Sequence, residues 1–315
     1  MKIVVSGYGI YLGVKNGMIS IREKEKERLE RLISVGNVEQ IVVASSGISI
    51  SSALLRLACE NGIDIVVLNS NGSFAGRFAP YIKKANVDVR KEQYKAQTDG
   101  RGLYLAKCFV RGKIMNQYYL LRSIAKNRKM RLEECGELKK RAENVESCQD
   151  QRDLIQEEAK AAEIYWKGIS RFYEMDKRRK RYDEPDAFNM ALNYGYAILM
   201  SHVMLSIDTT NLDPFAGFLH AENPRRPALV VDLMEEFRQP VVDRAVFKVS
   251  PEEKNGFLTR KSRKEIMAEV KKRLETKVTF SGRKLPIEYH IYLQARRIER
   301  FLLGKEKYSP FILRW

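Results

Sequence analysis

Residues 102–127 read GLYLAKCFVRGKIMNQYYLLRSIAKN, and their apolar side chains recur every three to four positions without a proline. This spacing predicts a long amphipathic helix. The stretch LIQEEAKAAEIYWKGISRFYE (154–174) has the same period, and the pattern continues from about Gln93 to Arg300. We therefore expect residues 89–315 to form one large, all-helical domain.

The first 88 residues have a different pattern, in which short β-branched runs such as KIVVSG and QIVVASSGISIS are separated by Gly, Asn and Ser. Asn16-Gly17 and Asn71-Gly72 are typical of hairpin turns, because both residue types tolerate a positive φ. Residues 52–61 have helical spacing and predict one short helix packed on the sheet. The predicted fold class is therefore α+β, with a small β-rich domain over residues 1–88 followed by the larger all-α domain.

The chain is strongly basic, since 57 Lys and Arg oppose 40 Asp and Glu in 315 residues, for a net charge of +17 and a pI near 9.6. Residues 1–85 hold 11 basic and 7 acidic side chains, so most of the excess lies in the helical part. Charge of this size favours nucleic acid as the partner. An anionic membrane surface and a merely soluble basic protein remain the alternatives. The run KRRKR (177–181) predicts either phosphate contact or a solvated loop.

The cysteines do not indicate a disulfide framework or a zinc site, because none is spaced as a CxxC pair. We expect reduced, mostly buried thiols at Cys59, Cys108, Cys135 and Cys148. The amino terminus lacks the pattern of a signal peptide and begins with a predicted strand, which favours a cytoplasmic location. Residues 187–207 carry no charged side chain, yet they are too polar for a membrane span. A helix buried in a large helical core is the better interpretation, and no membrane partner is expected.

Three histidines are available for chemistry. His202 lies in the apolar run and fits a core position, and His290 fits a structural or surface one. His220 differs because loop signals such as Asp213-Pro214 surround it, and loops on a rigid scaffold often carry function. A further helix is predicted at once after it, over residues 227–237.

That predicted helix carries Asp232, Glu235 and Glu236, so Asp232 can share a face with either glutamate. Such carboxylates are either solvated or gathered inward around a cation. Glu158, one turn before two alanines in QEEAKAAEIYW, supplies another acid. Two carboxylates and the imidazole of His220 suit Mn²⁺ or Mg²⁺ better than structural zinc.

Six segments of the chain occur in the order that is typical of one family. They are QYKAQ (93–97), LAKCFVRGKIMNQ (105–117), EEAKAAEIYW (157–166), FNMALNYGYAIL (188–199), LDPFAGFLH (212–220) and LVVDLMEEFRQPVVDRAV (229–246). The series, which spans essentially the whole chain, resembles the universal integrase and endonuclease of CRISPR adaptation, the first-numbered CRISPR-associated protein. The resemblance implies an amino-terminal β domain that dimerises and a larger, helical catalytic domain.

The resemblance also implies which residues act. Glu158, His220 and Glu235 are the implied catalytic residues and ligands of Mn²⁺ or Mg²⁺, with Asp232 as a possible additional carboxylate ligand implied by the same motif. Glu158 is preferred to the adjacent Glu157 because only Glu158 has the family's spacing to the two alanines and the tyrosine that follow.

Other side chains of the same motifs are additional candidates. Tyr165, Asn193 and Tyr194 are candidates for substrate contact or support of the site, and Arg238 for clamping a phosphate. Each of these four side chains is equally consistent with a role in packing alone. Lys113 and Gln117 are weaker candidates still.

The implied chemistry is metal-assisted phosphodiester transfer. The nucleophile is the 3′-hydroxyl of an incoming DNA fragment during insertion of spacers into a CRISPR array, or water in simple cleavage. The implied partners are DNA (double-stranded, branched or with 3′ overhangs), a second copy of the chain and a small companion adaptation protein.

The alternative is a non-catalytic, DNA-binding structural subunit of a nucleoprotein complex, in which the acids pair with arginines such as Arg225 and Arg226. The closing segment LLGKEKYSPFILRW (302–315) is expected to dock on the dimer or to become ordered only in a complex.

Overall fold

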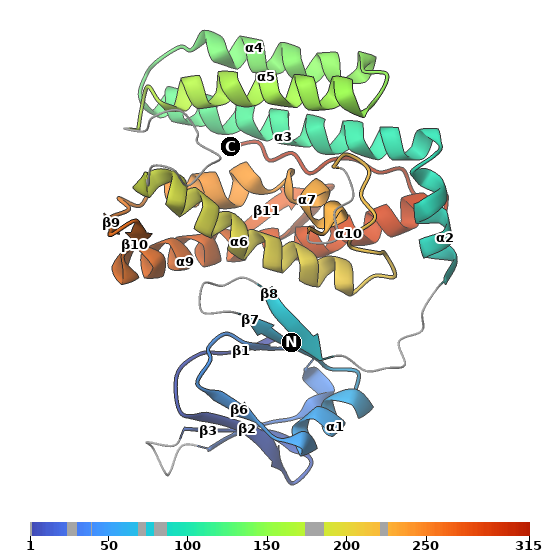
Figure 1. Ribbon diagram of the computed structural model, residues 1–315, viewed down its shortest axis with the longest axis vertical. Coiled ribbons are helices and arrows are strands. Elements are labelled where there is room, and N and C mark those ends of the chain that lie inside the picture. Colours follow the sequence, from blue (N-terminus) through green and yellow to red (C-terminus); the bar gives the residue numbers. More distant parts are fainter. Residues whose placement is uncertain are drawn as a thin grey trace. The chain divides into compact units, whose positions relative to one another are not determined.

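The computed structural model describes residues 2–23, 30–38, 40–68, 74–78, 87–173, 186–220 and 226–315. The chain divides into two compact units, Met1–Ala85 and Asn86–Trp315. The first is built mainly from strands and the second mainly from helices (Figure 1). The predicted α+β class is therefore confirmed.

Two four-stranded sheets form the first unit. One has the order β1 (Lys2–Val5), β5 (Gln40–Val43), β7 (Asp64–Leu68), β8 (Phe74–Phe78), and the other β4 (Glu30–Ile33), β3 (Met18–Glu23), β2 (Ile10–Lys15), β6 (Ile48–Ile50). Strands β1, β5 and β7 are parallel and β8 is antiparallel to β7. In the second sheet β2, β3 and β4 are antiparallel, and β6 is parallel to β2. A short 3₁₀ turn, η1 (Val35–Asn37), precedes β5.

Local signals explain several of these elements. Asn16 and Gly17 have φ angles of 52° and 72° between β2 and β3, which confirms the predicted hairpin turn. The predicted Asn71-Gly72 turn lies outside the described residues. The predicted short helix is α1 (Ser52–Glu60), and the Ser51 side chain accepts a hydrogen bond from the backbone N–H of Leu54 at its start.

The second unit contains most of the helices. They are α2 (Val87–Ala96), α3 (Gly100–Asn127), α4 (Glu133–Asn144), the 3₁₀ turn η2 (Val145–Ser147), α5 (Gln151–Ile169), α6 (Ala187–Asp208), α7 (Ala228–Met234), the π-helix η3 (Arg238–Asp243), α8 (Arg244–Val246), α9 (Arg260–Glu275) and α10 (Ile287–Leu302). Helices α3, α4 and α5 pack on one another, while α6 packs against α7, α9 and α10 (Figure 1).

Helix α6 contains the uncharged run 187–207 and ends at Asp208. It is the one helix in the described part of the chain that is long and apolar enough to cross a membrane, and 56% of its most apolar window is buried inside the protein. That burial fits the predicted core helix. A Cβ added at its Gly195 would lie 2.6 Å from Val242 Cγ1, so glycine permits the π-helix η3 to approach closely.

The helical unit also contains two antiparallel hairpins that its periodicity did not predict. They are β9 (Glu253–Lys254) with β10 (Phe257–Leu258), and β11 (Lys277–Phe280) with β12 (Arg283–Pro286). Each turns through two residues of positive φ, Asn255-Gly256 and Ser281-Gly282. The first of these turns carries an Asn-Gly signal, but the strands on either side of it are only two residues long.

The closing segment corrects an expectation, because it docks within its own helical unit. Tyr308 and Phe311 are completely buried. The backbone N–H of Phe311 donates to Glu236 Oε2 at 2.9 Å, and that of Leu313 donates to Asn116 Oδ1 at 2.8 Å. The aromatic residues of this segment are therefore part of the core, which composition alone did not reveal. All four cysteines are free, and Cys108 and Cys148 are buried.

Candidate metal centre

Two of the predicted ligands, Glu158 and Glu235, meet at one cation. The ammonium of Lys113 on α3 forms ion pairs with Glu158 Oε1 on α5 and with Glu235 Oε2, the latter at 2.7 Å. All three side chains are largely buried. Burial lowers the pKa of Lys113, but the two carboxylates outweigh it and raise that pKa overall, so the cation is retained.

Glu235 stays ionised although it is buried. It is the residue after the end of α7, only 2% exposed, and Arg238 Nε donates to its Oε2 at 2.8 Å. Burial alone raises a carboxyl pKa, but the charges of Arg238 and Lys113 outweigh it and lower the pKa of Glu235 to about 2. A buried, charged carboxylate whose partners are cations is suited to hold a metal.

His220 is positioned by Asp232. Its ring Nδ1 lies 2.7 Å from Asp232 Oδ1, which also accepts the backbone N–H of His220 at 3.1 Å. Asp232 Oδ2 accepts the backbone N–H groups of Phe218 and Leu219 at 2.6 and 3.0 Å. Both Asp232 oxygens are thus used to hold the loop and the imidazole, and Nε2 is the ring nitrogen left for a ligand.

A glycine makes this arrangement possible. A Cβ at Gly217 would lie 2.7 Å from Ala228 Cβ and 2.9 Å from Asp232 Oδ2, so a side chain there would push the loop away from α7. Burial lowers the pKa of His220, but its bond to Asp232 and the negative charges of Asp232, Glu235 and Glu158 raise it overall. These charges act on the imidazole because the three predicted ligands share one region.

The predicted helix over residues 227–237 is shorter than expected, since α7 ends at Met234. Pro240, which has no N–H, follows in the π-helix η3 and helps to break the α-helical hydrogen-bond series. Asp232, Glu235 and Glu236 consequently enter three different surroundings rather than one face. Glu236 accepts from the Tyr308 hydroxyl at 2.7 Å and from Gln294 Nε2 at 2.9 Å, partners different from the cations that hold Glu235.

The neighbouring glutamates of α5 also separate. Glu158 contacts Lys113, whereas Glu157 lies near Arg141 of α4, whose Nη1 is 3.2 Å from Glu157 Oε2, and near Lys160. The geometry therefore brings Glu158, and not Glu157, to Glu235.

The additional candidates are distributed differently. Tyr165 is fully buried and donates its hydroxyl to Asp243 Oδ2 at 2.9 Å, so it is a core residue. Burial and the Asp243 charge raise its pKa well above the ordinary value. Asn193 and Tyr194 are half-buried on α6. Gln117 is buried one turn after Lys113, and its Oε1 has no hydrogen-bond partner in the described part of the chain.

The sequence does not predict two further residues, Tyr196 and Asp243, that adjoin Arg238 in the structure. The Arg238 guanidinium lies 4.6 Å from the centre of the Tyr196 ring, and the Tyr196 hydroxyl donates to Asp243 Oδ1 at 2.5 Å. Tyr196 and Asp243 therefore hold Arg238 in place. Both lie inside the quoted motifs, but nothing in their spacing predicts that π-helix η3 turns Asp243 towards α6.

The donor chemistry fits a divalent metal. Among the described residues no three His, Cys, Asp or Glu side chains already surround one point closely enough to hold an ion. The Lys113 ammonium instead stands between two carboxylates, whose charges also act on the imidazole of His220. Oxygen ligands with one nitrogen suit Mg²⁺ or Mn²⁺, so the donor types of Glu158, Glu235 and His220 fit such an ion.

Two predicted cationic features cannot be placed. The run at 177–181 and Arg225 lie outside the described residues, and Arg226 is exposed. The other histidines have structural partners: His202 Nδ1 lies 3.2 Å from Glu288 Oε1, and His290 Nε2 lies 3.0 Å from the Val278 carbonyl oxygen. Of the three histidines, His220 alone adjoins the carboxylates that Lys113 bridges.

The chain is similar in sequence to a known protein family. The sequence profile of the family described as CRISPR associated protein Cas1 matches residues 3–278. The CRISPR-associated endonuclease Cas1 1 of Archaeoglobus fulgidus is 35% identical over 351 residues, covering 100% of both chains.

Two solved structures share the fold. A casposase bound to its integration product superimposes with a TM-score of 0.78 at 22% identity, covering 99% of this chain and 93% of that one. A partial Cas6-RT-Cas1–Cas2 complex gives 0.74 at 18% identity, covering 99% and 98%. Because the family profile and the full-length Archaeoglobus relative both match, the chain belongs to the Cas1 family of CRISPR-associated endonucleases.

Proposed function

We propose that this chain is a metal-dependent DNA endonuclease and integrase that inserts foreign DNA into a CRISPR array by attack of a 3′-hydroxyl on a phosphodiester. The observation that carries the proposal is the convergence of Glu158 and Glu235 on one cation, beside the Asp232-bound His220. Family membership supports the same activity.

In this proposal Glu158, His220 and Glu235 hold Mn²⁺ or Mg²⁺. The bound metal supplies Lewis-acid chemistry at the scissile phosphate. Asp232 would keep the ring proton of His220 on Nδ1, which would leave the Nε2 lone pair as the donor to a metal. Arg238, clasped by Glu235 and the Tyr196 ring, keeps the carboxylate oriented.

Lys113 has two states in this account. Without metal its ammonium neutralises Glu158 and Glu235. A metal held by Glu158 and Glu235 would neutralise the same charges and would leave the Lys113 ammonium available to a phosphate oxygen of DNA. Lys113 and Arg238 together offset the negative charge that accumulates during phosphoryl transfer.

We propose DNA with a double-stranded part, branches or 3′ overhangs as substrate, because the net charge of +17 favours a polyanion. A small companion of the Cas2 type is proposed as partner, supported by the shared fold with the Cas1 part of a Cas1–Cas2 complex. A homodimer through the β unit is supported by exposed apolar side chains there, including Val4 and Tyr8. A cytoplasmic location completes the proposal.

The test is strand transfer and cleavage on a supercoiled plasmid carrying a CRISPR repeat, with Mn²⁺ or Mg²⁺. Glu158→Gln and His220→Ala are expected to lose both activities while retaining DNA affinity, since binding depends on Lys and Arg. The matched control is Glu157→Gln, which changes the adjacent glutamate and should keep activity. Full activity in Glu158→Gln would refute the site.

The second candidate, a non-catalytic DNA-binding subunit, is favoured by one observation, the pairing of Glu235 with Arg238. It predicts that Mn²⁺ does not bind at these acids and that the wild-type chain neither cuts nor joins DNA. Chelation with EDTA distinguishes the two, because only the enzyme loses a measurable activity on metal removal.

A further inference from the structure

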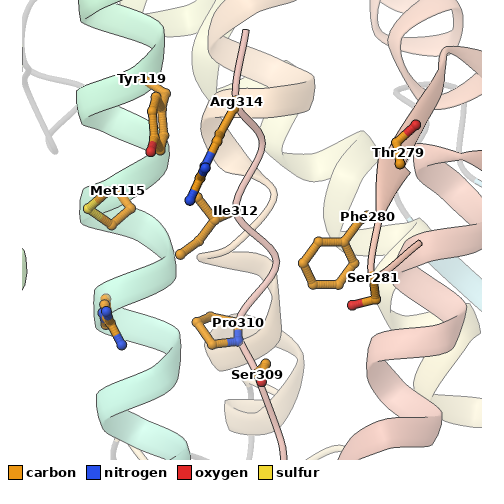
Figure 2. A pocket seen from close by; sticks show the side chains of 10 residues that line it. Met115, Tyr119, Thr279, Phe280, Ser281, Ser309, Pro310, Ile312 and Arg314 are labelled. Carbon is orange, nitrogen blue, oxygen red and sulfur yellow. The ribbon is translucent and has the colours of Figure 1, made fainter. Parts of the chain in front are cut away.

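A groove of about 510 Å³ lies in the helical unit between α3, the β11–β12 hairpin and the closing segment (Figure 2). Arg111, Met115 and Tyr119 of α3 form one wall, Phe280 the opposite side, and Ile312 and Arg314 the floor. None of the described residues that line it is acidic. The groove therefore combines cationic, aromatic and apolar surface.

The groove is separate from the candidate metal centre. Arg111, Met115 and Tyr119 follow one another at four-residue spacing and occupy one face of α3. Lys113 is about 200° further round the helix than Arg111 and contacts the carboxylates. Anything bound in the groove thus lies across α3 from the reacting phosphate.

The floor of the groove is held rigidly. On the buried side the segment is fixed by Glu236, which accepts from Phe311 N, and by Asn116, which accepts from Leu313 N. Alternate residues of an extended segment point to opposite sides. Ile312 and Arg314 therefore face the groove, as Figure 2 shows. A preformed floor lowers the entropic cost of binding.

The side chains match a single nucleic-acid strand. The Arg314 guanidinium lies 5.9 Å from the centre of the Tyr119 ring, so a cation adjoins a stacking surface. Arg111 is exposed and makes one surface ion pair, 3.3 Å from Glu146, which a phosphate can replace. Aromatic rings beside arginines are the usual platform for unpaired bases and their phosphates. The volume fits a ligand-sized group, about one or two nucleotides, and not a duplex.

We propose that this groove holds a short single-stranded segment of the DNA substrate, with a base stacked on Tyr119 and phosphates on Arg111 and Arg314. The inference rests on the proposed function and adds a second DNA contact to it. Because α3 stands between groove and carboxylates, the strand held here is the one that is not cut. A forked or overhanging end then has its two strands divided by α3.

The experiment measures fluorescence anisotropy of labelled oligonucleotides with full-length protein in EDTA, so that binding is independent of catalysis. The probes are a single strand, a fork and a blunt duplex. Tyr119→Ala should weaken binding of the single strand and the fork about tenfold, by loss of stacking. Arg111→Ala and Arg314→Ala should each reduce the slope of log affinity against log salt for the single strand by about 0.7. Blunt-duplex affinity should change less than about twofold.

Three controls keep the test decisive. Tyr119→Phe preserves the aromatic ring and should bind the probes as the wild type does. A folding defect in Tyr119→Ala or Tyr119→Phe would appear as a lower melting temperature. Arg152→Ala removes an exposed arginine of α5 that does not line the groove, and should not discriminate between the probes. Metal-dependent cleavage of a blunt duplex should persist in all groove variants.

Equal loss of single-strand and duplex binding, or no loss, would overturn the proposal. Unchanged DNA binding with weakened binding of a protein partner would also overturn it and assign the groove to a protein. Failure of the wild type to cleave, with selective single-strand loss in Tyr119→Ala, would refute the proposed function but not the groove.

Discussion

Glu235 and Glu236 are adjacent in sequence and equally buried, yet they belong to opposite kinds of region. Glu235 lies at the candidate metal centre, where Arg238 and Lys113 lower its pKa to about 2 against the effect of burial. Glu236 lies at the anchor of the closing segment among neutral donors, and burial raises its pKa to about 7. Partner charge, rather than burial or spacing, decides which acid can hold a metal.

The largest expected effect tests this contrast directly. Glu235→Gln should lower metal-dependent cleavage and strand transfer at least about a thousandfold, because a charged ligand is lost. Glu236→Gln keeps a neutral acceptor in place and should retain activity within about tenfold. Initial rates on the repeat plasmid measure both. Similar losses of activity in the two variants would contradict the assignment of only Glu235 to the metal centre.

The next largest effect is expected at Lys113, one of the two cations that keep Glu235 ionised. Lys113→Met leaves Glu158 and Glu235 without their shared partner and should destabilise the metal-free protein by about 3 kcal/mol. Mn²⁺ should raise the melting temperature of this variant more than that of the wild type, because the ion replaces the missing charge. Equal Mn²⁺-induced shifts of the melting temperature in the two proteins would mean that the metal does not bind where the Lys113 ammonium lies.

The two acids should also give stability profiles of opposite sign. Since the pKa of Glu236 rises from 4.5 to about 7 on folding, its contribution is full below pH 4.5 and is lost as the pH rises to about 7. The loss is at most about 3 kcal/mol, or less after structural relaxation. Glu235, whose pKa falls to about 2, contributes above pH 4.5 and loses its contribution as the pH falls towards 2.

Chemical denaturation at pH 5 and pH 8 measures this difference. From pH 5 to pH 8 the wild type should lose stability relative to Glu236→Gln, which cannot titrate. Parallel behaviour of the two proteins would show that Glu236 is not protonated in the folded state near neutral pH.

The smallest effect is expected at the anchor itself. Tyr308→Phe removes the hydroxyl that donates to Glu236 Oε1 at 2.7 Å and should cost about 1 kcal/mol of stability. Activity should be unchanged, since Glu235 keeps its own partners. Urea unfolding and plasmid cleavage, measured on the same preparation, separate the two regions. A large loss of activity with normal stability in Tyr308→Phe would show that the anchor and the metal centre are not independent.

Much of the fold can be predicted from the sequence because local residue patterns determine many of its helices and turns. The 3.6-residue period of residues 102–127 predicts α3, and Asn16-Gly17 predicts the turn between β2 and β3. The hairpin around Asn255-Gly256 was missed, although its turn signal is equally local, because the flanking strands are only two residues long.

The site was less accessible because its contacts are not local. The pairing of Lys113 with Glu158 and Glu235 joins three separate elements, and no periodicity reports it. Helical spacing alone lets Asp232 share a face with either Glu235 or Glu236, so it does not distinguish the two glutamates. The end of α7 at Met234 and the buried Tyr308 separate them, and both depend on tertiary packing.

The most direct test of the central claim is anomalous diffraction from crystals soaked in Mn²⁺. One strong peak is expected within ligand distance of Glu158, Glu235 and His220 Nε2, with the Lys113 ammonium displaced and Glu236 still bound to Tyr308. No peak there under saturating Mn²⁺, with Lys113 still bridging the two carboxylates, would contradict it.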